Sequence, residues 1–90
     1  MQRVEAGTPI NRTTTGSVSL VPGTLIGFYI NSTNAGTLVI GNGSGAAGTA
    51  VTGTITPAIG FHGANIYLTT GCHATIGGTA LDVTFFFAAG

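Results

Sequence analysis

The chain has 90 residues, of which only four are charged, and its formal net charge is zero. Charged residues usually make up about a quarter of a soluble domain, whereas here they make up 4%. The missing basic clusters exclude binding to nucleic acid or to an anionic membrane, and 43% apolar residues exclude a disordered chain. A single cysteine excludes an internal disulfide. The first residues lack the apolar core of a secretory signal, so we expect synthesis in a cytoplasm.

Residues 1–16 differ from the rest of the chain. They hold three of the four charged side chains, and Pro9 and the TTTG run at 13–16 favour extended or turn structure. Such a segment is ordered only where something holds it. We therefore predict an extended N-terminal arm at 1–16 and one domain at 17–90.

From residue 17 onward, apolar and small polar residues alternate with the period of a half-buried strand. VPGT at 21–24 is typical of a type II turn, whose third residue needs positive φ. Segment 25–31 is apolar on both faces, so we expect a central strand or one covered by a partner. Gly77 and Gly78 predict a hairpin turn beside a short edge strand. The predicted strands are 17–20, 25–31, 37–40, 50–56, 65–70, 72–76 and 80–87.

Short strands separated by turn signals are typical of an all-β domain. The pattern predicts a small antiparallel β-sandwich, either jelly-roll or immunoglobulin-like, or a small barrel. Threonine at the outward positions supports this fold, because it is β-branched and polar without being charged.

Few side chains offer reactive chemistry. The GSGAAG loop at 43–48 matches a dinucleotide-binding pattern, but a threonine-rich segment follows it where a helix is required. His62, Cys72 and His73 are the only soft metal ligands, and adjacent strand residues point to opposite faces. We therefore expect no metal site and no Cys–His catalysis.

Asp82 is the only carboxylate in the domain, on an outward strand position. One acid cannot perform paired-carboxylate chemistry, and Arg3 or Arg12 are possible ion-pair partners. We predict a protein that is not an enzyme and has no cofactor.

The aromatic run at 85–87 is more informative. Alternation places Phe86 on the face opposite Phe85 and Phe87. Two interpretations stay open: Phe86 packs under the N-terminal arm, or Phe86 and Tyr29 help form a subunit interface, where aromatic residues are enriched and charges depleted. Both hold if the arm comes from a neighbouring copy.

The charged residues of the arm also have two interpretations. Arg3, Glu5 and Arg12 are either solvated tail charges or the ion-pairing residues of a docking arm. Docking is the more specific hypothesis, because ordering such a segment costs free energy that binding to a partner would have to offset.

The chain has no net charge to suppress self-association. TLVIG at 37–41 and VTFFF at 83–87 are apolar enough to aggregate if they lie at open sheet edges. We therefore predict that the protein functions as a symmetric oligomer or on a large assembly.

Three segments carry a family resemblance: GTLIGFYINSTNAGTLVIGNGSGAAGTAVTGTITP, NIYLTTG and ALDVTFFF. They resemble the small β-sandwich virion proteins of tailed bacteriophages, which include capsid decoration (cement) proteins. The shared features are a G-x-L-x-G-x-x-x-N strand end, a Gly/Ser/Ala/Thr loop, an L-T-x-G turn and a closing D-V-T strand, over residues 17–87.

This resemblance implies a location in the virion, no catalysis, no cofactor, and many copies bound to the major capsid protein or another virion protein. Decoration proteins are commonly trimers and often grip the capsid with terminal arms, so a homotrimer is expected. Two alternatives remain: a tail, fibre or neck component, or a small glycan-binding module using Tyr29 and Tyr67.

Overall fold

The computed structural model describes residues 8–45 and 48–90, which form six strands. All of the strand pairings are antiparallel, so the predicted all-β antiparallel fold is confirmed. No helix capable of crossing a membrane occurs in the described part of the chain. The strands are β1 (Thr8–Arg12), β2 (Gly16–Ser19), β3 (Gly23–Asn42), β4 (Thr49–Ala50), β5 (Gly60–Leu68) and β6 (Cys72–Ala89).

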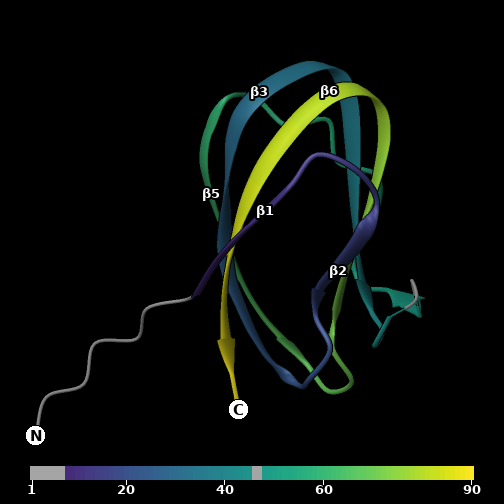
Figure 1. The fold of residues 1–90 in the computed structure, drawn as a ribbon, viewed down its shortest axis with the longest axis vertical. Coiled ribbons are helices and arrows are strands. Elements are labelled where there is room, and N and C mark those ends of the chain that lie inside the picture. Colours follow the sequence, from purple (N-terminus) through teal and green to yellow (C-terminus); the bar gives the residue numbers. More distant parts are fainter. Residues whose placement is uncertain (1–7, 46–47) are drawn as a thin grey trace, which may run out of the picture.

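The two long strands, β3 and β6, pair along their whole length and arch together over one end of the molecule (Figure 1). On one side of the arch the strands form a sheet in the order β1–β6–β3–β5, and on the other side they form a sheet in the order β2–β6–β3–β4. The arched ribbon therefore contributes two central strands to each of two four-stranded sheets. These sheets pack face to face, so the predicted sandwich is confirmed.

The strand pairing is nested. Six strands, with β3 and β6 each counted as two halves, give eight segments. The first pairs with the eighth, the second with the seventh, the third with the sixth and the fourth with the fifth. One antiparallel ribbon folded over itself in this way is a jelly roll, which decides between the two predicted sandwich types.

The predicted turn at 32–36 and the hairpin at Gly77 and Gly78 are wrong. Both segments lie inside continuous strands, where β3 and β6 cross from one sheet to the other. The register shifts repeatedly between Ile30 and Thr37, and Gly78 adopts a φ of 77°. The small and polar residues thus form bulges that bend a paired ribbon instead of reversing it.

The segments that were predicted to be edge strands lie inside the sheets instead. Segment 72–76 is the first half of β6 and lies between β2 and β3. TLVIG lies in β3 and VTFFF in β6, so both are central strands flanked by others. The expectation that these two segments would form open, aggregating edges is therefore wrong, and it gives no support to an oligomer.

The predicted strand at 50–56 is mostly irregular. Only Thr49–Ala50 forms a strand, although Leu38 and Ile55 exchange backbone hydrogen bonds of 2.9 and 2.8 Å. Between them, the hydroxyl Oγ1 of Thr52 accepts from the backbone N–H of Ile40 at 3.0 Å. A side chain that takes a backbone partner in this way competes with the regular ladder.

The predicted boundary between arm and domain is also corrected. Residues 8–12 form β1, whose register runs from Thr8 opposite Phe87 to Arg12 opposite Val83, and β2 already begins at Gly16. Ile10 packs against the core, and Pro9 is tolerated because β1 is an edge strand. The sandwich thus includes residues 8–16, whereas residues 1–7 lie outside the described residues.

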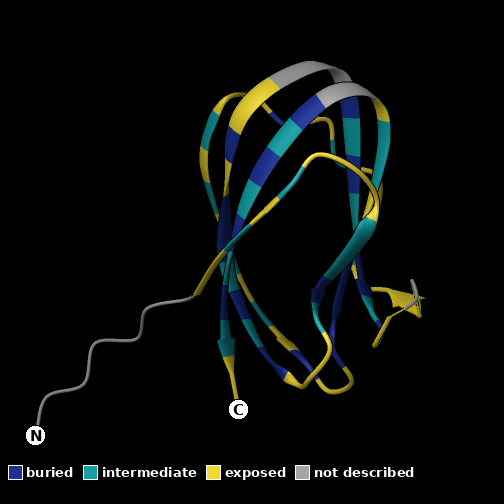
Figure 2. Cartoon of the chain, viewed as in Figure 1, coloured by how far each residue is buried: buried dark blue, intermediate teal, exposed yellow. Residues whose placement is uncertain are grey.

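The core lies between the sheets, and its buried residues recur as dark blue bands along β3 and β6 (Figure 2). In β6, Phe85 and Phe87 are buried while Phe86 is only half-buried, which confirms the predicted alternation. In β3, a register shift between Leu25 and Gly27 breaks the expected alternation. The core residues are Val18, Leu25, Phe28, Ile30, Leu38, Ile40, Leu68, Cys72, Ala74, Leu81, Val83, Phe85 and Phe87.

Candidate interaction surface

Three aromatic side chains from different strands meet on the outward face of the β1–β6–β3–β5 sheet. Tyr29 on β3 is 42% exposed, Phe61 on β5 is 57% exposed and Phe86 on β6 is half-buried. Tyr29 and Phe61 are direct cross-strand partners. The ring centroids of Phe61 and Phe86 are 6.1 Å apart, with the planes inclined by 50°, a favourable tilted geometry. We call Tyr29, Phe61 and Phe86 the aromatic cluster.

Gly27 makes this arrangement possible. It lies on β3 opposite both Phe86 on β6 and Gly63 on β5. A Cβ at Gly27 would lie only 2.7 Å from Cζ of Phe61 and 2.6 Å from the backbone oxygen of His62. The Phe61 ring therefore lies over the glycine and reaches Phe86 across the intervening strand.

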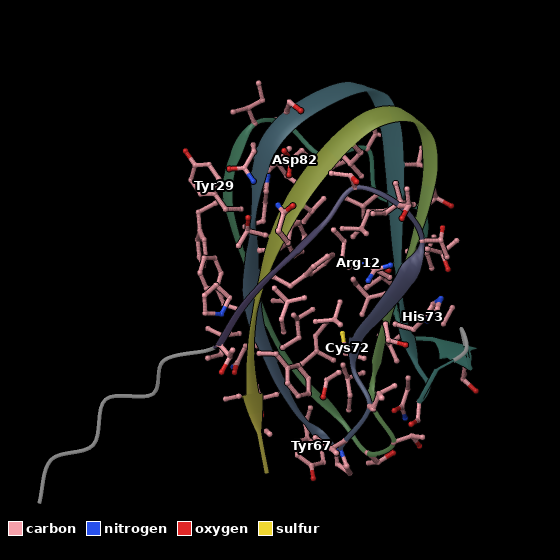
Figure 3. The ribbon with its side chains drawn as sticks, viewed as in Figure 1. Arg12, Tyr29, Tyr67, Cys72, His73 and Asp82 are labelled. Atoms are coloured by element: carbon pink, nitrogen blue, oxygen red, sulfur yellow. The ribbon has the colours of Figure 1, made fainter. Side chains whose placement is uncertain are left out.

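A polar network lies beside the aromatic cluster on the same sheet. Oδ1 of Asp82 accepts from Nδ2 of Asn11 at 2.6 Å and from Nδ2 of Asn31 at 3.4 Å. Oγ1 of Thr84 accepts from the same two amides, at 3.2 and 3.0 Å. Thr84 is also the cross-strand partner of Tyr29. The network therefore joins β1, β6 and β3 next to the aromatic cluster, and Figure 3 shows Asp82 and Tyr29 at the same end of the molecule.

Arg12 does not pair with Asp82, so this predicted option is corrected. Arg12 lies opposite the buried Val83, so its side chain projects from the inner face of the sheet. Asp82 lies on the outer face. Nε of Arg12 donates to the backbone oxygen of Thr14 at 3.4 Å, and its Nη2 donates to that of Thr15 at 3.2 Å. The guanidinium thus closes the turn between β1 and β2, over Gly16, instead of reaching out to a partner.

The structure therefore brings together two of the five predicted interface residues, Tyr29 and Phe86. Arg3 and Glu5 lie outside the described residues. Phe61 was missed because 57–63 looked like a connection between strands. The alternation of outward residues along β5 was the available signal, but two of its four outward positions are Gly63 and Asn65, which are poor strand formers.

The side chains that could act as a nucleophile or as metal ligands do not form a cluster. Cys72 is in the core, and its neighbour His73 is also buried, opposite Ser17 of β2. The His62 ring stacks on Phe28 in the other sheet, with ring centroids 5.4 Å apart. Figure 3 shows Cys72 between the layers. Among the described residues, no group of three His, Cys, Asp or Glu side chains is placed to hold a metal ion. Nδ1 of His73 is buried and lacks a hydrogen-bond partner, for which we have no functional account.

Burial determines the protonation of Cys72. Desolvation raises the pKa of its thiol from 9.0 to about 12, because an apolar interior disfavours the thiolate. A thiolate nucleophile at neutral pH is therefore not available from this residue.

This shift predicts an alkaline loss of stability. Between about pH 9 and about pH 12 the unfolded chain releases the thiol proton and the folded chain keeps it, so stability is complete below pH 9 and falls with rising pH. The expected slope is about 1.4 kcal/mol per pH unit, measured by urea unfolding at several pH values. Cys72→Ala is the control, since its small cavity lowers stability equally at every pH. A variant with the unchanged alkaline slope would contradict the assignment.

The outward face of the other sheet is different in kind. Its strands β2, β6 and β3 present Ser17, Thr75 and Thr37 there, and this face has no Phe, Tyr or Trp side chain in the described residues. No family model matches the chain, and neither does any curated protein or solved structure. The feature of the molecule that bears most on its function is therefore the chemical difference between the two outward faces of the jelly roll.

Proposed function

We propose that this protein is a non-enzymatic structural protein of a tailed bacteriophage virion, made in the host cytoplasm, and that it decorates and stabilises the assembled head as a homotrimer. One observation supports this proposal most. In the first half of β3 (23–30), in β5 (65–68) and in the second half of β6 (82–87), the three resembling segments form adjacent strands of a single sheet, β6–β3–β5. That sheet presents the aromatic cluster on its outward face.

The charges of the domain suit repeated protein contacts. In the described residues, the side chains charged at neutral pH are Arg12 and Asp82, and both are hydrogen-bonded within the chain. Such a body exerts little long-range electrostatic force, so contacts depend on shape and apolar area. A protein that binds the assembled shell but not its free subunits stabilises the shell by mass action.

Imaging of native particles tests the location. Purified particles are labelled with an antibody against the chain and examined by electron microscopy. We expect label distributed over the head in many copies. Label confined to the tail, fibres or neck would replace decoration by the alternative structural role, and unlabelled particles that lack the chain by mass spectrometry would overturn the virion proposal.

The docking-arm hypothesis predicts the effect of a short deletion. Removing residues 2–7, with Arg3 and Glu5, leaves every pairing of β1 with β6 in place. We expect unchanged circular dichroism and thermal unfolding but a loss of binding to undecorated shells, measured by co-sedimentation. A deletion through residue 16 is not a suitable test, because it would remove β1 and uncover the core.

The variant with Arg3→Gln and Glu5→Gln at full length is the matched control. It separates the two charges from the length of the segment. Shell binding that survives the deletion would refute the docking arm while leaving the decoration role to the sandwich itself.

A glycan-binding module is the second candidate. It is favoured by the position of Tyr29, an exposed ring beside the Asn31 and Asp82 polar groups, because sugar sites combine an aromatic platform with amide and carboxylate groups. A glycan array with no hits would remove this candidate.

A further inference from the structure

We propose that a second copy of this chain covers the aromatic cluster, so that the outward face of the β1–β6–β3–β5 sheet is the self-association surface. Tyr29 and Phe61 together leave roughly 200 Å² of aromatic surface exposed, given about 200 Å² for each full side chain. Phe86 and the backbone of Gly27 extend this apolar area across β3 to β6. Interfaces are enriched in aromatic side chains of this kind.

The face is large enough for a specific interface. With strands about 4.8 Å apart and about 3.4 Å of strand per residue, the nine residues of β5, the five of β1 and about eight each from β3 and β6 cover roughly 490 Å² in projection. Two copies meeting on it would bury about 1,000 Å² in total, which is the lower limit for a specific contact.

The charge of the face favours another copy over a charged partner. Among the described residues, Asp82 is the only carboxylate side chain on this face, and two side-chain amides already hydrogen-bond to its Oδ1. This bonding lowers the cost of removing the carboxylate from water. The chain has no net charge, so two copies do not repel each other. A strongly basic or acidic partner would find no complementary cluster here among the described residues.

The outward face of the other sheet is a poorer candidate for a self-association surface. Its outward strand positions carry serine, threonine, valine and histidine, and no phenylalanine or tyrosine among the described residues. The difference is not a requirement of the fold, since both sheets have the same number of strands. It therefore points to the aromatic face as the surface that is covered in the functional protein.

The inference rests on the proposed homo-oligomer and specifies its contact: the same face of two copies meets, which closes a pair instead of the predicted trimer. It is tested without any virion. The molar mass of the full chain is measured by light scattering at about 100 µM, above the micromolar dissociation constants of weak specific complexes. We expect a mass of about twice the 8.9 kDa of one chain. Phe61→Lys, which places a charge in the aromatic cluster, is expected to reduce the mass to 8.9 kDa with unchanged circular dichroism.

Thr75→Lys is the matched control, because it adds the same charge to an exposed strand position on the other sheet and is expected to keep the wild-type mass. Tyr29→Thr is the second test variant if Phe61→Lys fails to fold. A monomeric wild-type chain, or a folded Phe61→Lys chain with wild-type mass, would overturn the proposal. A monomer that binds glycans would assign the face to carbohydrate instead. An oligomer that is absent from virions would refute only the decoration role.

Discussion

Replacing Phe85 with alanine is expected to lower the free energy of unfolding by about 3–5 kcal/mol. Phe85 is fully buried in β6, and its ring centroid lies 6.1 Å from that of Phe28, its cross-strand partner on the inner face of the same sheet. Truncation removes this contact and leaves a cavity between two sheets that cannot both move inward. A domain of this length has a total stability of about 5–13 kcal/mol, so the loss is a large fraction of it. Urea unfolding monitored by circular dichroism measures the change.

Phe86→Ala is the control, since the two phenylalanines are adjacent in β6 but lie on opposite faces of the sheet. Phe86 is only half-buried, so we expect a clearly smaller loss than for Phe85. Both substitutions are compared in a Phe61→Lys background, because oligomerisation would otherwise add a concentration-dependent contribution to stability. Equal losses would mean that the inner and outer faces of β6 are assigned incorrectly.

The second large effect is expected for Gly71→Ala, with a loss of about 1–3 kcal/mol. Gly71 is buried between β5 and β6, and a Cβ there would lie 2.7 Å from the backbone oxygen of Gly43 and 2.8 Å from that of Ser19. Both oxygens belong to the backbone of other segments, so neither can move aside by a side-chain rotation. This crowding outweighs the gain of about 0.4–1 kcal/mol from a stiffer unfolded chain. Thermal or urea unfolding gives the value.

Gly53→Ala separates crowding from the general effect of adding a methyl group. No heavy atom lies within 4 Å of a Cβ at Gly53, so we expect stability to stay the same or to rise slightly. If Gly71→Ala behaved like Gly53→Ala, the close approach of Gly43 and Ser19 to β6 would be refuted.

The strand periodicity was the most reliable signal in the sequence. The alternation from Leu81 to Phe87 predicted which face of β6 is buried, because successive strand residues point to opposite sides whatever the strand pairs with. The same rule predicted that Cys72 and His73 would separate and that Phe86 would leave the core. These are local properties of one extended segment, and no partner strand is needed to derive them.

The predicted turns were less reliable. The glycines at 77–78 and the STNAG segment at 32–36 have the composition of turns, yet they bend a continuous ribbon. A turn and a bend use the same permissive residues, and the choice depends on whether the flanking segments find partners on both sides. Here β6 supplies partners for β3 across both segments, so the pairing continues through them.

The candidate interaction surface was predicted in part. Tyr29 and Phe86 could be assigned to outward positions from periodicity, and they lie on the same sheet. That Phe61 completes the cluster depends on the register between β5 and β3 and on the open space above Gly27. Arg12 was expected to reach outward, but its strand joins the sheet and directs it inward to its own turn.

The all-β class, the inner face of β6 and the near absence of charge could be read from the amino-acid sequence, since they follow from composition and from the period of two. The jelly-roll order, the inclusion of residues 8–16 in the sandwich and the contact of Phe61 with Phe86 became clear only in the folded molecule. The reason is that these features depend on contacts between distant parts of the chain: Asn11 and Asp82, which hydrogen-bond across β1 and β6, are 71 residues apart. Local patterns specify which residues are extended and which side is apolar, whereas the choice among partner strands depends on how the whole ribbon buries its apolar faces at once.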